Sequence, residues 1–239
     1  MIPKIIHFCW FGKGPYPKEF ESYLASWKKY CPDYTIMEWN ESNFNTESNN
    51  YVKEAYSAKK WAFVTDYVRL WAIYSYGGIY MDTDVELLRP IDEFLSNHAF
   101  SGYESVKTIP TGIMGGEKGN PIYKDLLDEY EGRKFILENG KYNLTTNVEY
   151  ITNYFVARGL KPNDTEQNIA GFVLYPKDYF CPKNPRTLKI EITKNTYAIH
   201  HFASSWVPVK TRMRKRIKKI LGPRLMEVVI KIRDSLGIQ

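Results

Sequence analysis

Two stretches of sequence decide the fold of this chain: AFVTDYVR at residues 62–69 and GGIYMDTD at residues 77–84. The second stretch is apolar up to Met81 and then places Asp82 and Asp84 two residues apart. Alternate side chains of an extended strand point the same way, so the two carboxylates can hold one divalent cation between them. The pattern predicts a short buried strand that ends in a metal site.

The first stretch predicts a helix that ends at the glycine pair. No Gly or Pro interrupts residues 61–76, and aromatic residues recur at helical spacing from Phe63 to Tyr74. Asp66 and Arg69 stand three residues apart, so they share one face of this helix. A mostly apolar helix tolerates an acid and a guanidinium when they pair with each other or meet a ligand, and the sequence leaves both readings open.

Strand-like and helix-like segments alternate along the chain, which predicts an α/β domain with one mostly parallel central sheet flanked by helices. The predicted strands are residues 5–11, 34–39, 79–82, 99–103, 111–116, 172–175 and 197–202, and the predicted helices are residues 18–30, 51–76, 122–130 and 147–156. Ligands of such sheets bind beyond the carboxyl ends of the strands. Trp10 and Phe11 follow the first strand, as Asp82 and Asp84 follow the third.

Composition indicates an intracellular globular protein. The chain has 239 residues, of which 44% are hydrophobic and 15% aromatic, enough for one domain with a sizeable core. Its three cysteines are an odd number without C-x-x-C spacing, so neither a disulfide framework nor a zinc site is indicated. We see no signal-peptide pattern and no apolar run of about 18 residues that could span a bilayer, so we expect a cytoplasmic protein.

The basic charge is concentrated after residue 206. Residues 207–239 hold ten Lys or Arg and two acidic residues, a local charge of +8, so the first 206 residues carry −2 of the net +6. Apolar residues recur there at helical spacing, which predicts a basic amphipathic helical tail at residues 207–239 behind a domain at residues 1–206. Such helices favour anionic membrane surfaces, although a tail packed on the domain would show the same pattern. No nucleic-acid-binding motif accompanies the charge.

Three blocks of sequence resemble the family-32 glycosyltransferases, which include bacterial capsule-type transferases and yeast mannosyltransferases. A-x-x-x-D-x-x-R followed by G-G-x-Y-x-D-x-D is similar to the family's sugar-binding and D-x-D region, IPKIIHFCWFG at residues 2–12 to its first strand, and AIHHFASSW at residues 198–206 to its closing motif. The resemblance implies a GT-A type fold. It also implies metal-dependent, retaining transfer of a hexose or N-acetylhexosamine from a UDP- or GDP-sugar to a saccharide or lipid-linked acceptor, as in surface or capsular polysaccharide synthesis.

The resemblance also implies roles for individual residues. Asp84 would bind Mn²⁺ or Mg²⁺ directly, and Asp82 would reach the metal through water or bind the ribose. Asp66 and Arg69 would bind the donor sugar, and these four residues form the expected catalytic set. The other residues expected to bind the donor are Trp10, Phe11, Tyr80, Ser205 and Trp206.

Either histidine of the closing motif can complete the metal shell. His200 and His201 alternate faces on a strand, so only one can readily point into the site, and we favour His200. Several alternatives remain open. Asp82 and Asp84 can simply cap a turn, Trp10 and Phe11 can be core aromatics, and Gly112 can serve either a tight turn or close approach of the acceptor.

The mechanism and the function class also have alternatives. We favour front-face attack over double displacement, because the sequence shows no clear nucleophile; the carboxylates that remain candidates are Glu104, Glu117 and Glu149. A nucleotide-sugar hydrolase or a non-catalytic sugar-binding protein could carry a similar site. From the basic tail and the expected lipid-linked acceptor, we expect the chain to lie on the inner face of a bacterial cell membrane.

Overall fold

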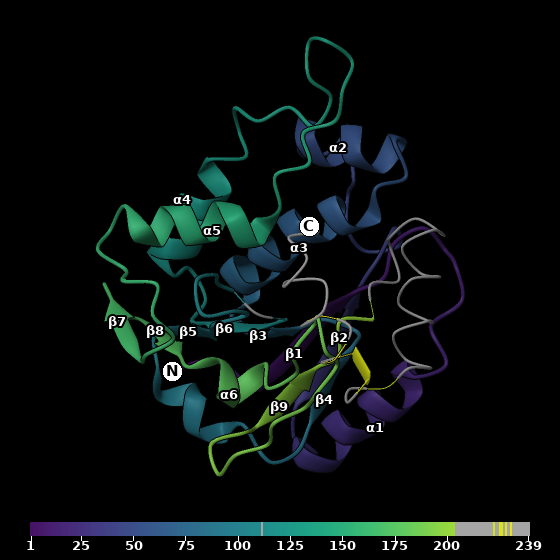
Figure 1. Cartoon of the computed structure of the whole chain (residues 1–239). Helices are drawn as coiled ribbons and strands as arrows, with labels where there is room; N and C mark the ends of the chain where they lie inside the picture. Colours follow the sequence, from purple (N-terminus) through teal and green to yellow (C-terminus); the bar gives the residue numbers. More distant parts are fainter. Residues whose placement is uncertain (111, 204–221, 223–224, 227, 229, 231–239) are drawn as a thin grey trace.

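The computed structural model describes residues 1–110, 112–203, 222, 225–226, 228 and 230. A seven-stranded sheet with the order β2-β1-β3-β6-β5-β8-β7 forms its centre (Figure 1). The strands of this sheet are β1 (Ile5–Cys9), β2 (Thr35–Trp39), β3 (Gly78–Met81), β5 (Ala99–Gly102), β6 (Ile113–Gly116), β7 (Gln167–Ile169) and β8 (Phe172–Tyr175). A second, two-stranded sheet pairs β4 (Val85–Leu87) with β9 (Ala198–His200).

Five of the seven strands run in one direction. β1 is parallel to β2 and to β3, and β5 is parallel to β8. β3 and β5 are both antiparallel to β6, so they run the same way as each other, while β7 is antiparallel to β8. The prediction of an α/β domain with a mostly parallel sheet is confirmed, and the carboxyl ends of β1, β3 and β5 lie at one edge.

Each face of the large sheet has its own helical layer (Figure 1). One face is covered by α2 (Asn50–Ser57), α3 (Trp61–Tyr76), α4 (Pro121–Asp128) and α5 (Asn147–Val156). The other is covered by α1 (Phe20–Tyr30), the 3-10 helix η1 (Asp92–Ser96), α6 (Lys177–Phe180) and the β4-β9 pair.

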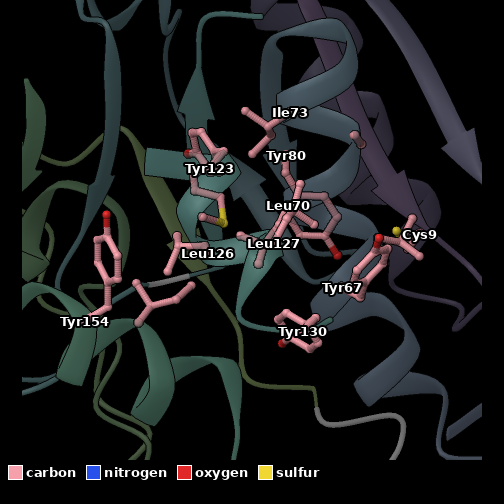
Figure 2. Packing of buried hydrophobic residues seen from close by; sticks show 14 of the residues in the cluster. Cys9, Tyr67, Leu70, Ile73, Tyr80, Tyr123, Leu126, Leu127, Tyr130 and Tyr154 are labelled. Atoms are coloured by element: carbon pink, nitrogen blue, oxygen red, sulfur yellow. The ribbon is translucent and has the colours of Figure 1, made fainter. Parts of the chain in front are cut away.

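The residues of β3 alternate between the two cores, as strand geometry requires. Tyr80 joins the cluster under α3 and α4, whereas Ile79 and Met81 join the cluster on the α1 side. Figure 2 shows aromatic and aliphatic side chains around Tyr80, among them Leu70 and Tyr123, closing the space between α3 and the sheet. A core of this density holds the end of β3 in one place.

The segment 51–76, predicted to be mostly helix, forms two helices, and the helix predicted for residues 61–76 is α3. α2 and α3 are separated at Ala58–Lys60, where Lys59 adopts a φ of 55°, a left-handed conformation that ends a helix. The elements absent from the sequence prediction are all short: β4, η1, β7 and α6. β4 is three residues long and pairs with a strand more than 100 residues later, so no local pattern marks it. The predicted tail at 207–239 lies almost wholly outside the described residues.

Candidate functional site

The end of β3 and the end of β9 bring three metal-type ligands together. The chain turns directly after Met81, and β4 then pairs with β9 so that Val85 lies opposite His200. One side-chain atom each from Asp82, Asp84 and His200 lies within 4.8 Å of the others. The Nε2 atom of His200 is 3.4 Å from Asp84 Oδ1 and 3.8 Å from Asp82 Oδ2.

The chain fixes the orientation of Asp84. Its Oδ2 atom accepts a hydrogen bond of 2.6 Å from the Ala203 amide, and its carbonyl accepts one of 2.9 Å from the His201 amide. Burial alone would raise the pKa of Asp84, but His200 and the Ala203 amide outweigh it and lower that pKa to about 2. Burial would likewise lower the pKa of His200, yet Asp84 holds it well above its usual value.

Two carboxylates and an imidazole suit Mg²⁺ or Mn²⁺. Carboxylate oxygens are the ligands that these cations prefer, and imidazole is a common further ligand of Mn²⁺ and its neighbours. The three groups lie close enough to share one ion without moving the strands that carry them. The donor set therefore fits the predicted cation.

His201 does not face this cluster. Its Nε2 atom lies 2.8 Å from Glu86 Oε2, and its ring stacks on Tyr23 at 4.8 Å between centroids. The reason is strand alternation: His200 ends β9 with its side chain toward Asp84, so the next side chain points the other way. The prediction that left His201 open as a metal ligand is wrong in this arrangement.

Asp66, Arg69 and Asp82 form one buried charge network. The guanidinium of Arg69 lies 3.4 Å from Asp66 Oδ1 and 3.2 Å from Asp82 Oδ1, and it stacks over the Tyr80 ring at 4.6 Å. Burial raises the pKa of Asp66 to about 6, although Arg69 opposes that shift. The structure thus brings Asp66 and Arg69 of α3 together with Asp82 of the D-x-D motif, although the sequence places them on separate elements.

Tyr80 lies beneath this network and does not reach open space. Its side chain is fully buried, and its hydroxyl donates a 2.9 Å hydrogen bond to Asp82 Oδ1. The expectation that Tyr80 binds the donor is therefore corrected: every residue of β3 is buried, and Tyr80 instead orients Asp82 and Arg69.

Asn147 is a site residue that the sequence did not reveal. Its backbone amide donates to Asp66 Oδ2 at 3.3 Å, and its side-chain amide donates to the Asp66 carbonyl at 3.0 Å. Asn147 is the first residue of α5, so the positive end of that helix also faces the Asp66 carboxylate. The sequence predicted the start of the helix correctly, but its partner is 81 residues away and leaves no local signal.

The two aromatic residues after β1 differ in their exposure to solvent. Trp10 is partly exposed beside a shallow pocket, which is lined by Trp10, Lys13, Glu38, Asn40, Glu41 and Ser42. Phe11 is buried and packs edge-on against Phe44. Trp10 therefore remains a candidate for stacking on a nucleotide base, whereas the structure contradicts that role for Phe11.

Other predicted residues fall outside the site or outside the described chain. Glu117 pairs with His98 and the amino terminus, and Glu149 is exposed on α5. Glu104 lies within the electrostatic reach of Asp82 and His200. The expected donor-binding residues Ser205 and Trp206 are not among the described residues.

Gly112 provides the space in which Asp82 and His200 meet. Its carbonyl accepts a 2.8 Å hydrogen bond from the Asp82 amide. A Cβ atom at this position would lie 3.1 Å from Asp82 Oδ2 and 3.1 Å from the His200 ring. Gly115 and Gly116 serve the core instead, because a Cβ there would strike Phe100 or Tyr123.

Replacing Gly112 with Ala is expected to weaken Mn²⁺ binding about tenfold, or about 1.4 kcal/mol, because the new methyl group pushes two ligands apart. Isothermal titration with MnCl₂ measures the change. Gly132→Ala is the matched control, since a Cβ there meets nothing within 4 Å. Equal Mn²⁺ affinity in the two variants would show that the metal does not lie between Asp82 and His200.

Comparison with known proteins gives consistent matches. Residues 17–101 match the family described as "Glycosyltransferase sugar-binding region containing DXD motif". The chain is 30% identical over 132 residues to inositol phosphoceramide mannosyltransferase 3 of Schizosaccharomyces pombe, covering 51% of this chain and 35% of that protein. It is 26% identical to an uncharacterized glycosyltransferase of Acanthamoeba polyphaga mimivirus, covering 87% of this chain and 85% of that protein.

A more distant likeness extends to a solved glycosyltransferase involved in glycosylation of the major capsid of PBCV-1. The two chains are 14% identical with a TM-score of 0.49, over 89% of this chain and 98% of the other. The chain spans about a third of the length of the yeast mannosyltransferase. Within the described residues, no helix has the length and apolar character needed to cross a membrane.

Proposed function

We propose, from the match of residues 17–101 to the family described as "Glycosyltransferase sugar-binding region containing DXD motif", that this chain transfers a sugar from a nucleotide diphosphate donor to a saccharide or lipid-linked acceptor. The observation that carries the proposal is the meeting of Asp82, Asp84 and His200 beside the Asp66–Arg69 pair.

The metal-type ligands and the charge network have complementary tasks in the proposed reaction. A divalent cation on Asp82, Asp84 and His200 would supply positive charge to the departing diphosphate. Arg69 and Asp66 would hydrogen-bond hydroxyls of the donor sugar and hold its reacting carbon in place. Asn147 donates to Asp66, while the Tyr80 ring lies beneath Arg69 and the Tyr80 hydroxyl donates to Asp82, so both residues help to orient the network.

We propose retention of configuration by front-face attack. The acceptor oxygen forms the new bond to the anomeric carbon on the side from which the diphosphate oxygen leaves, and the acceptor proton passes to that leaving oxygen. Asp66 is committed to Arg69 and to Asn147, which makes it a poor nucleophile. Double displacement through Glu104 is the alternative tested below.

The donor sugar and acceptor are proposed by analogy. The yeast relative is named for mannose transfer to inositol phosphoceramide, which favours a mannosyl donor and a lipid-linked acceptor for this chain. UDP-hexoses and UDP-N-acetylhexosamines are the competing donors. A role in surface or capsular polysaccharide synthesis would use the same chemistry.

The membrane location also belongs to this proposal. Ten basic residues at 207–239 would attract the chain to the anionic inner face of a bacterial membrane. Flotation with vesicles of phosphatidylcholine and phosphatidylglycerol tests it: binding that does not depend on the anionic lipid would contradict the idea.

One assay separates transfer from the alternatives. The protein is incubated with MnCl₂ and each of GDP-mannose, UDP-glucose, UDP-galactose and UDP-N-acetylglucosamine, with and without octyl glycosides as acceptors. We expect one donor to be consumed faster when an acceptor is present, and excess EDTA to stop the reaction. Nucleotide release that no acceptor accelerates would indicate a hydrolase, and no consumption of any donor would favour a binding protein.

A further inference from the structure

Glu104 stands at the same edge of the sheet as the metal-type ligands, two strands away. β3 and β5 flank β6, with Tyr80 and Ser101 both paired to Met114. Asp82 directly follows β3, and Glu104 lies two residues beyond β5. Neighbouring strands are about 4.8 Å apart, so β5 lies about 10 Å from β3.

Along this edge, Glu104 lies on the side of Asp82 that is farther from β1. The strand order β1-β3-β6-β5 places Trp10, then Asp82, then Glu104 along one edge. If a nucleotide base lies near Trp10 and its diphosphate near Asp82, the transferred sugar and then the acceptor extend toward β5. Glu104 is therefore placed where an acceptor would arrive.

The chain between β3 and β5 contributes no bulky side chain at the level of Asp82. The residue of the intervening chain that lies level with Asp82 is Gly112, which bonds to the Asp82 amide and has no side chain. Any larger residue would lean on Asp82 and His200, as its Cβ distances show. The Asp82 and His200 side chains fill the space above Gly112, and Gly112 itself adds no side chain between Asp82 and Glu104.

The backbone at Glu104 is firmly held. Its amide donates to the Thr108 carbonyl at 2.9 Å, and its carbonyl accepts a contact of 3.6 Å from Cys181 Sγ. The loop that follows is fastened to α5, because the Ile109 amide donates to Thr152 Oγ1 at 3.0 Å. These hydrogen bonds anchor the backbone of Glu104 and the loop that follows it.

The Glu104 carboxylate has no partner in the part of the chain that the structure describes: it makes neither a hydrogen bond nor an ion pair there. It is partly buried, and burial raises its pKa, with His200 and Arg69 opposing that shift. Because the described residues supply no donor to this partly buried carboxylate, its oxygens can accept hydrogen bonds from a ligand or from water. It is also not one of the three groups that cluster as metal ligands.

We propose that Glu104 forms an acceptor subsite, in which its carboxylate accepts a hydrogen bond from a hydroxyl of the acceptor saccharide next to the attacking one. The inference rests on the proposed transferase function. In this role Glu104 positions the acceptor and forms no covalent bond, so the donor reacts with water whether or not the carboxylate is present.

The test compares the wild-type chain with Glu104→Gln and Glu104→Ala. The donor is the nucleotide sugar consumed fastest in the assay above, with MnCl₂, and the acceptors are octyl α-mannoside, octyl β-glucoside and octyl β-galactoside. Release of nucleotide to water is measured without acceptor, and sugar transfer is measured over a range of acceptor concentrations. Glu166→Gln, an exposed carboxylate beside β7, is the matched control.

We expect both Glu104 variants to release nucleotide to water within about threefold of the wild-type rate, and to need at least about tenfold more acceptor for half-maximal transfer. An unchanged acceptor KM would overturn the proposal. Loss of water release together with transfer would also overturn it, because Glu104 would then be a nucleophile or a donor-binding group. Wild-type protein that releases nucleotide but transfers sugar to no octyl glycoside would contradict the proposed function itself.

Discussion

Donor turnover by Asp84→Asn is expected to fall by about a thousandfold or more, which corresponds to about 4 kcal/mol of transition-state stabilisation. The Asp84 carboxylate accepts a hydrogen bond from the Ala203 amide and lies 3.4 Å from His200, and the Asp84 carbonyl accepts a hydrogen bond from the His201 amide. The amide retains the shape of the side chain but removes the charge that a divalent cation needs. Nucleotide release with saturating MnCl₂ measures the effect.

Asp33→Asn is the control for that variant. Asp33 is an exposed partner of Lys4 just before the amino end of β2, far from the site along the strands. We expect its turnover to match that of the wild-type chain, and both variants to keep the wild-type circular dichroism spectrum. Turnover by Asp84→Asn within tenfold of the wild-type rate would mean that Asp84 holds no essential metal.

The second large effect is expected for Arg69→Lys. Arg69 contacts two carboxylates at once and lies 4.6 Å from the centroid of the Tyr80 ring, a set of contacts that suits a planar guanidinium and not a single ammonium group. Hydrogen bonds to charged groups contribute about 1.5–3 kcal/mol, so kcat should fall about 10- to 100-fold. Steady-state kinetics with the preferred donor gives the number.

Arg158→Lys provides the comparison, because Arg158 is exposed just after the end of α5 and pairs with Asp125. It should leave kcat unchanged. A structural role for Arg69 alone predicts a different result: the variant would show a lower unfolding temperature in differential scanning calorimetry and a normal kcat in the fraction that remains folded.

The parts of the fold that could be predicted are those with strong local patterns. The helix of Asp66 and Arg69, the strand before Asp82 and the α5 segment 147–156 each show their periodicity within a short window, and all three are present. The break between α2 and α3 was not predicted, because Lys59 carries no signal for its left-handed conformation. Three-residue strands such as β4 depend on a distant partner.

The candidate site also has features that local sequence patterns predict and features that they do not. The helix spacing predicted that Asp66 and Arg69 face each other, but no spacing could show that Arg69 also reaches Asp82 from another element. Alternation on a strand showed that only one histidine enters the site, and β4–β9 pairing selects His200. Asn147 and Glu104 required the tertiary structure, since their neighbours in the site come from segments far away in the sequence.

The central claim is that Asp82, Asp84 and His200 hold the cation that binds the donor diphosphate. Anomalous diffraction from crystals grown with MnCl₂ and GDP, or with UDP if a UDP-sugar is the preferred donor, tests it directly. We expect one manganese peak in contact with carboxylate oxygens of Asp82 and Asp84 and with Nε2 of His200, and the nucleotide diphosphate on its remaining side. A nucleotide bound without manganese at these three side chains, or manganese bound only elsewhere, would contradict the account.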